Sequence, residues 1–486
     1  MPCAVSQGSP ALSIALAGSS KRIFQTGDTI IGKVVRRQHI VAPECQVTLR
    51  LLGRAKTKIV VTRSNGNGGT RHDTYRSRYH FFGPETGQII FAGPLHVATE
   101  EAAPAEFPFV ITIPAHPSEN LSREAGRNSF LPTDPASIAA QPLPPSYASY
   151  HHHREAYVEY WLEAQLNPGP GTHNKSVSPA LSTQPIILGA PPTLEPVAKM
   201  VKTSPSPAHS ITSYRLIPGM DEVELSFKQK SKQFFHTSSV PSLSYSIHVG
   251  IPVVMQLQSR DTIPLTLRLS PMARGTSDDV QKTTQKATID YITLQLKTNT
   301  VIRAGEHFLG GSRETSTSDA QDLHLEKALK ALPTPMVVDI DPDGEAINLG
   351  ALFDLHLCES GLFSGNERLS SQWFAPPITP SFVTYNMTVS HALKVTVSVT
   401  VCGKGHSDTF KLDTRIMSPP IMNRIPQNRP KQAIQLEAGP APPSFAEAMW
   451  ETAGGEAERP PNYNQEPKAV SEAMRDVESK VAMTPK

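Results

Sequence analysis

A proline pair followed by a tyrosine lies near the carboxyl end of the chain, at Pro460, Pro461 and Tyr463. Paired prolines favour the extended polyproline II conformation, and a tyrosine two places further on supplies a flat ring for the aromatic groove of a WW domain. The surrounding residues are rich in Pro, Ala, Glu and Gln, which predicts a disordered tail over 421–486 that a partner can reach. The motif therefore predicts WW-domain binding rather than catalysis.

Two further segments resemble this motif and are candidate secondary WW sites. The one in the tail ends in phenylalanine, so it lacks the tyrosine hydroxyl. The other has the full pattern and precedes a predicted strand. The resemblance of the neighbouring segments to a known family implies a structural turn there, and WW binding is the alternative. These candidates are Pro442, Pro443 and Phe445 in the tail, and Pro144, Pro145 and Tyr147 before the strand.

Positive charge is concentrated in residues 21–78, although the whole chain carries a net charge of only +2. Arg50, Arg54, Lys56 and Lys58 alternate with other residues, so they project from one face of a predicted strand. This face is a candidate contact for acidic or phosphorylated cytosolic tails or for anionic lipid headgroups, and a merely solvated face is the alternative. Nucleic acid is not expected, because no stacking pattern or recognised binding motif accompanies the charges.

Two patterns suggest a metal ion. Asp339, Asp341 and Asp343 are spaced like the start of a calcium loop, but Gly350 stands where a bidentate Glu is required, so a turn is favoured. The three histidines at 151–153 are consecutive, and consecutive side chains in an extended loop point apart. The sequence also lacks HExxH, GxSxG and Walker-type motifs. We therefore expect no enzyme activity, no metal and no cofactor.

The composition suits a large protein with long irregular segments. The chain has 486 residues, of which 38% are hydrophobic and 45 are proline, so part of it should be loop or tail. Its four cysteines are too sparse for a disulfide framework or a zinc site, which favours reduced thiols in the cytosol. No apolar run approaches the roughly 18 residues of a membrane span. The apolar stretch 11–18 lacks a preceding basic region, so a strand is expected there rather than a signal peptide.

Apolar residues recur with period two along most of the chain, which predicts an all-β fold of antiparallel sandwiches. The clearest predicted strands cover 47–61, 107–113, 157–166, 263–269, 292–296 and 387–401. Helical periodicity is confined to 319–332. The expected domains are a first sandwich over 1–190 with a loop insertion at 114–156, a linker over 191–210, a second sandwich over 211–420 with an insertion at 303–335, and the tail over 421–486. The Pro-, Gly- and Ser-rich connection over 167–210 is expected to carry one edge strand.

Several short segments follow one another in an order that is characteristic, although each is too short to be specific alone. GDTIIGKVV, VTLRLLGRAKT, FPFVITIP, LPPSY and YVEYWLEAQL follow one another in the first half. They resemble the amino-terminal domain of the arrestin-like proteins, specifically the α-arrestin branch found in fungi and animals. The second half is similar to the carboxy-terminal domain of that family, through IPLTLRLSP and the run 379–404, in which 382–387 matches the family's F-x-T-x-N-I opening.

The resemblance implies two tandem immunoglobulin-like arrestin β-sandwiches without a catalytic centre. It implies a cytoplasmic adaptor, recruited peripherally to plasma or endosomal membranes, that bridges the cytosolic tails of membrane transporters or receptors to a WW-domain HECT-type ubiquitin ligase. Cargo would then be ubiquitinated and internalised by endocytosis. Two alternatives stay open: a trafficking scaffold of the same fold that recruits no ligase, and a β-sandwich hydrolase or lectin-like binder.

Overall fold

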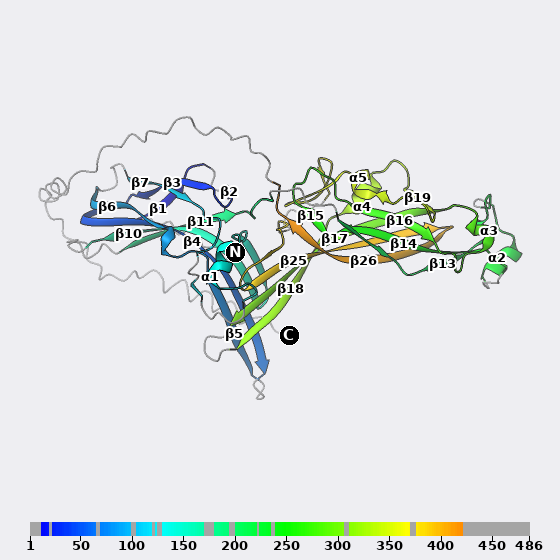
Figure 1. Ribbon diagram of the computed structural model, residues 1–486, viewed down its shortest axis with the longest axis horizontal. Coiled ribbons are helices and arrows are strands. Elements are labelled where there is room, and N and C mark those ends of the chain that lie inside the picture. The colour runs from blue at the N-terminus through cyan, green and yellow to red at the C-terminus, as the bar shows by residue number, and fades with distance from the viewer. Residues whose placement is uncertain are drawn as a thin grey trace, which may run out of the picture.

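The structure, a computed structural model, is built almost entirely of strands arranged in two lobes (Figure 1). We call residues 11–193 the N-lobe and residues 200–420 the C-lobe. The all-β prediction is confirmed. The described residues are 11–18, 22–64, 69–98, 104–118, 122–123, 129–169, 179–193, 200–220, 223–234, 239–305, 311–369 and 376–420.

The N-lobe consists of a small sheet in the order β1-β3-β7 and a larger sheet in which the long strand β4 pairs with β5, β6 and β10. Strand β10 also pairs with β9 and β11. The strands are β1 (Ser13–Leu16), β2 (Ile23–Phe24), β3 (Thr29–Arg36), β4 (Ile40–Ser64), β5 (Thr70–His80), β6 (Gly87–Val97), β7 (Ala105–Thr112), β8 (Ser122–Arg123), β9 (Tyr147–His151), β10 (Arg154–Pro168) and β11 (Ala180–Leu188).

In the C-lobe, β14 pairs with β12, β13 and β16, while β25 lies between β17 and β26. The strands are β12 (Val201–Pro205), β13 (His209–Thr212), β14 (Ser242–Pro252), β15 (Val254–Gln256), β16 (Thr266–Pro271), β17 (Gln285–Gly305), β18 (Ser312–Asp322), β19 (Val337–Ile340), β20 (Ile347–Asn348), β21 (Leu355–Cys358), β22 (Gly361–Ser364), β23 (Glu367–Arg368), β24 (Phe382–Val383), β25 (Met387–Val401) and β26 (Lys404–Met417).

The helices are short and lie at the ends or edges of the sheets (Figure 1). They are α1 (Pro135–Ala140), α2 (Phe227–Phe234), α3 (Asp278–Gln281), α4 (Leu325–Lys330) and α5 (Leu349–Leu352), with single 3-10 turns η1 (Pro84–Thr86) and η2 (Tyr214–Leu216). Within the described residues no helix is long and apolar enough to cross a membrane.

The alternating sequence pattern places one face of each long strand in a core. Along β4 every second residue from Val47 to Ile59 is buried, and along β25 the odd-numbered residues from Met387 to Val401 are all buried. Each fully buried aliphatic side chain contributes about 1.5–3 kcal/mol relative to an exposed one. The apolar alternation therefore accounts for both the strands and the faces on which they pack.

Two glycines in the N-lobe strands make room for aromatic rings. A Cβ at Gly32 would lie 2.7 Å from the ring of Phe109, and a Cβ at Gly53 would lie 2.5 Å from the ring of Tyr160. These contacts are closer than real Cβ atoms approach, so a larger residue would push the ring out of the core. Gly32 of β3 and Gly53 of β4 thus allow aromatic side chains to pack against the strands.

The hydrophobic core of the N-lobe extends into strands of the C-lobe. Besides residues of β3, β4, β7 and β10, its buried members include Ile302 and Ala304 near the end of β17, and Tyr385 and Met387 at the start of β25. The C-lobe core is a separate cluster in which Val395, Val397, Val399 and Val401 are prominent. The lobes are therefore joined by shared apolar packing as well as by the chain.

Two regions expected to be loop or linker contain regular elements, and one expected helix is shorter than predicted. The segment 114–156 includes α1 and β9, and β12 lies within the stretch expected to be a linker. The helix expected over 319–332 is present only as α4, because the residues before it form β18, which pairs with β17. Within these segments local periodicity was weak, and pairing with distant strands determines the conformation.

Candidate functional site

The basic residues on β4 lie opposite glutamates on β10. The antiparallel register places Arg50 across from Glu163, Arg54 across from Glu159 and Lys58 across from Glu155. The shortest nitrogen to oxygen distances in these three pairs are 2.8, 2.5 and 2.8 Å, in that order. We call these six residues the charge ladder. Opposite charges directly across a sheet stabilise the pairing of the two strands.

The charge ladder compensates three of the four basic residues that the sequence singles out on this face. The sequence predicts exposed positive charge on this strand, whereas three of the four basic residues are neutralised by a carboxylate. Arg54 also lies over the ring of Trp161, with its guanidinium carbon 4.8 Å from the ring centroid. Lys56 lies on the same face, half-buried, and has no ion-pair partner among the described residues. On the other side of β4, Arg76 and Arg78 of β5 lie directly across from Lys58 and Lys56, so the face as a whole keeps an excess of positive charge.

The segment containing Pro144, Pro145 and Tyr147 holds the two lobes together. Both prolines are buried, and the carbonyl oxygen of Pro144 accepts a hydrogen bond of 2.8 Å from the hydroxyl of Tyr160. The hydroxyl of Tyr147 lies 2.6 Å from the hydroxyl of Thr300 in the C-lobe, and its ring packs edge-on against Phe382. Burial raises the pKa of Tyr147. In this conformation the prolines are not accessible to a WW groove, which favours the structural interpretation of this motif.

The other WW candidates lie outside the described residues. Both Pro442, Pro443 and Phe445 and the principal motif at Pro460, Pro461 and Tyr463 follow the last described residue, Pro420. The main-chain nitrogen of Thr193 donates to the carbonyl oxygen of Pro419 at 3.3 Å, so the described chain ends beside the connection between the lobes.

A buried polar junction joins the lobes, and sequence reasoning did not identify it as a site. Asn386 is 1% exposed, and its Nδ2 donates to the Thr57 hydroxyl at 3.2 Å and to the carbonyl oxygens of Ala55 and Ser77, each at 3.4 Å. The Thr57 hydroxyl donates in turn to the carbonyl oxygen of Arg303 at 2.6 Å. Burying any of these polar groups without a hydrogen bond would cost free energy. The junction is therefore stable because each group is hydrogen-bonded to another.

Aromatic contacts surround this polar junction. The rings of Tyr79 and Tyr385 stack with centroids 5.1 Å apart, one from each lobe. The guanidinium carbon of Arg303 lies 3.7 Å from the ring centroid of Phe130, and its Nε donates to Glu314 at 2.7 Å. Asn386 lies within the F-x-T-x-N segment noted in the sequence, which was the one signal available for it.

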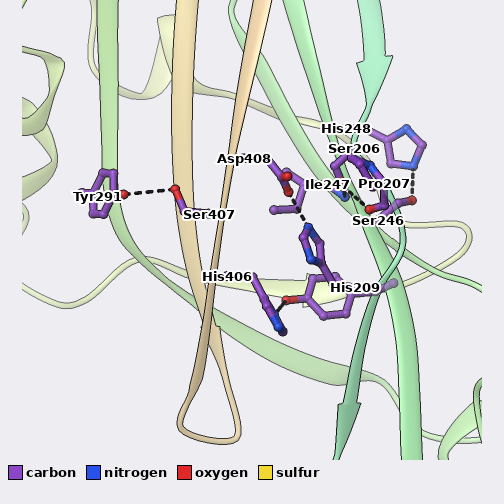
Figure 2. A network of polar contacts seen from close by, with 11 residues as sticks. Ser206, Pro207, His209, Ser246, Ile247, His248, Tyr291, His406, Ser407 and Asp408 are labelled. Atoms are coloured by element: carbon purple, nitrogen blue, oxygen red, sulfur yellow. Dashed lines mark hydrogen bonds and ion pairs between the residues drawn. The ribbon is translucent and has the colours of Figure 1, made fainter.

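A second polar cluster lies in the C-lobe, between β13, β14 and β26 (Figure 2). His209 pairs with Asp408, and its ring stacks on that of His406 with centroids 4.7 Å apart. The hydroxyl of Tyr245 lies 2.9 Å from Nδ1 of His406. Burial and the neighbouring His209 lower the pKa of His406. These groups satisfy one another and connect the short strand β13 to β26.

The residues of the two patterns that suggested a metal ion make other contacts in the structure. The main-chain nitrogen of Asp343 donates to Oδ1 of Asp341 at 3.0 Å, as in a turn stabilised by an aspartate. Nε2 of His151 contacts Asp319 at 3.1 Å, whereas the ring of His153 stacks near that of His72.

One cluster that was not anticipated brings together Asp322, His324 and Glu326 at the start of α4. Their ligand-type atoms lie within 4.8 Å of one another, and Nδ1 of His324 is 3.0 Å from Glu326. These are donor types that divalent metals accept. His324 has a left-handed backbone, with φ of 56°, where the chain enters the helix. The contacts among these three side chains also stabilise that conformation.

The polar and charged clusters of the described residues thus contact one another within the protein, and several of them join the two lobes. A scan against models of known protein families and a search of curated proteins both found no match to this chain.

Proposed function

We propose that the chain is a non-enzymatic adaptor of the arrestin-like type, which bridges membrane-protein cargo to a WW-domain HECT-type ubiquitin ligase. The observation that carries the proposal is the combination of a two-lobed β body, whose lobes share apolar packing, with the Pro460-Pro461-Asn462-Tyr463 motif more than 40 residues beyond its last strand in the sequence. Tethering a ligase to a body that holds cargo raises the effective concentration of the ligase near cargo lysines. Ubiquitinated cargo would then enter endocytosis.

The burial of Pro144 and Pro145 sharpens this proposal. Because these prolines pack inside the protein, the principal motif in the tail is left as the main candidate ligase contact, with Pro442, Pro443 and Phe445 as a weaker second one. A short proline-tyrosine ligand binds a WW domain with a dissociation constant on the order of micromolar, or about 8 kcal/mol. Tyr463 should supply much of that free energy.

The charge ladder limits which basic side chains of β4 an anionic cargo tail or lipid headgroup could reach. Acidic cargo tails or anionic headgroups would have to displace Glu155, Glu159 or Glu163 to reach Lys58, Arg54 or Arg50. Lys56 alone on this strand is not compensated by an ion pair among the described residues. We therefore expect any anionic contact at this face to be weak and to disappear as salt rises past about 0.15 M, where the screening length is about 8 Å.

The ligase contact is tested by comparing the full chain with its Tyr463→Ala variant in titrations against an isolated WW domain of a HECT-type ligase. We expect binding to fall below detection in the variant. Tyr147→Phe is the matched control, since it alters the buried tyrosine and should leave WW binding unchanged. Equal affinity of the parent and Tyr463→Ala would overturn the bridging mechanism and favour a trafficking scaffold that recruits no ligase.

A further inference from the structure

A cavity of about 1180 Å³ lies between the two lobes. Residues 142–145 and 190–193 of the N-lobe line one side, and strands β24, β25 and β26 of the C-lobe line the other. Ligand sites in proteins occupy roughly 300–1,000 Å³ and occur preferentially between domains. The space is therefore ample for a small organic ligand, and its position involves both lobes.

Much of the cavity lining is apolar. Pro142, Pro191 and Pro192 line it from the N-lobe, Pro142 exposed and the other two half-buried. Phe382 and Val383 of β24 line the facing side, and Val383 is 43% exposed. Apolar surface of this kind gains about 25 cal/mol per Å² when a ligand removes it from water, so an alkyl chain is a suitable occupant.

The charged residues of the lining are mostly positive. Lys297 of β17 and Lys411 and Arg415 of β26 carry three positive charges, against the one negative charge of Asp413. Lys411, Asp413 and Arg415 alternate along β26, so they share one face of the strand, and all three are exposed. Within the described part of the chain, none of these four side chains has an ion-pair partner. The uncompensated charge differs from the balanced charge ladder on β4 and favours an anionic group.

A buried imidazole also lines the cavity. His391 is 3% exposed, its Nδ1 lies 3.0 Å from the Ser381 hydroxyl, and its Nε2 has no hydrogen-bond partner among the described residues. A buried nitrogen without a partner costs about 1–3 kcal/mol.

We propose that this cavity binds a single-chain anionic amphiphile, with its carboxylate or phosphate near Lys297, Lys411 and Arg415 and its alkyl chain along the apolar lining. Charge complementarity selects the head, and the accessible proline, phenylalanine and valine side chains of the lining select the chain. The proposal is independent of the ligase contact, because no residue of the tail takes part. An acidic peptide would share the anionic character but would not use the apolar lining.

The test uses the full chain and isothermal titration with oleate, oleoyl lysophosphatidate, oleyl alcohol, inorganic phosphate and a polyglutamate peptide, with the lipids below their micelle concentrations. We expect one oleate or lysophosphatidate to bind per chain, and the better of the two identifies the head as carboxylate or phosphate. Oleyl alcohol, phosphate and the peptide should bind at least about tenfold more weakly. Equally tight binding of oleyl alcohol, or tighter binding of the peptide, would overturn the proposal.

Substitutions locate the site. The triple change Lys297→Gln, Lys411→Gln and Arg415→Gln should weaken amphiphile binding about tenfold. The matched control, Lys228→Gln, Lys230→Gln and Lys232→Gln, removes the same charge from α2 at the distal end of the C-lobe (Figure 1) and should have no effect.

A second variant tests the apolar lining with little risk to folding. Val383→Glu places a negative charge in the cavity at a partly exposed position and should also weaken binding, with an unchanged melting temperature. Equal affinity of the cavity triple variant and the α2 control would place the amphiphile elsewhere and contradict the proposal.

Discussion

The two faces of β4 carry different polar chemistry. On the inward face, Thr57 is fully buried and its neutral hydroxyl is held between Asn386 and the carbonyl of Arg303. On the outward face, Arg54 and Lys58 keep part of their surface in water and each faces a glutamate. One strand thus joins the lobes with neutral hydrogen bonds and holds its neighbouring strand with charges.

This difference follows from the cost of removing each kind of group from water. A neutral hydroxyl or amide is tolerated in a core when it is hydrogen-bonded, whereas an ion that loses its water and its partner costs several kcal/mol. We therefore expect substitutions on inward faces to affect stability strongly and those on outward faces to affect it weakly.

The largest effect is expected for Val397→Asp, on the inward face of β25. Val397 is completely buried in the C-lobe core, so the substitution buries an unpaired carboxylate and should cost at least about 3 kcal/mol, enough to make the protein insoluble or the lobe unfolded. Thr396→Asp is the control, because Thr396 is half-exposed and contacts only Thr409 by a side-chain hydrogen bond. Soluble yield and melting temperature measure both. Equal loss in both variants would mean that the faces are not distinct.

The next effect concerns pH, through the imidazole of His391. Burial lowers its pKa from 6.5 to about 4. Between these two pH values the imidazole is protonated in the unfolded chain but not in the folded chain. The contribution of the neutral imidazole to the free energy of unfolding is therefore fully present above pH 6.5 and is lost as the pH falls toward 4. The loss should reach about 3 kcal/mol.

Denaturant unfolding at pH 7 and at pH 4.5, for the parent and for His391→Gln, checks this contribution. Glutamine does not titrate in this range, so the stability difference between parent and variant should shrink or reverse at the lower pH. The same difference at both values would show that His391 is accessible to protons in the folded state.

A smaller effect is expected at the lobe junction. Asn386→Ala removes the donor to three acceptors, two carbonyl oxygens and the Thr57 hydroxyl, and should cost about 2 kcal/mol in the free energy of unfolding. Asn299→Ala is the control, since Asn299 is half-buried beside the cavity and should change stability by less than about 0.5 kcal/mol. Chemical denaturation of the two variants decides whether the inward face is the sensitive one.

The smallest effects are expected in the charge ladder, and they should be graded. Glu159→Gln affects a nearly buried carboxylate and should cost about 1 kcal/mol, whereas Glu163→Gln affects a pair whose arginine is largely exposed and should cost less than about 0.5 kcal/mol. High salt should reduce the smaller cost more, because exposed pairs are screened more strongly. The reverse order would mean that burial does not govern these pairs.

Local pattern alone predicted the strands and their faces. Period-two alternation predicted β4, β10 and β25 and the buried side of β4 and β25, because alternation is a property of neighbouring residues. In β10 both faces are buried from Ala156 to Leu162, which alternation does not predict. The charge ladder could not be predicted in this way. Its signal was present, since Arg50, Arg54 and Lys58 share a spacing of four with Glu155, Glu159 and Glu163, but the register that aligns them is set by packing between distant parts of the chain.

The lobe junction shows the same limit. Asn386 lies in a segment that the resemblance had already marked, yet its acceptors belong to residues of β4 and β5 in the other lobe. The positions of Pro144 and Pro145 were decided similarly, because only the packing of Tyr160 and Tyr147 shows that the motif is enclosed. The motif at Tyr463 lies outside the described residues and stays a prediction.

The long strand β17 has a mechanical consequence. It pairs with β25 along one part of its length and with β18 along another, and at Gly305 it pairs with Arg76 of β5 in the N-lobe. A pulling force applied to one lobe is therefore carried along a continuous strand into the other, and it is resisted by many backbone hydrogen bonds at once. We therefore expect the two lobes to resist a pulling force together rather than one after the other.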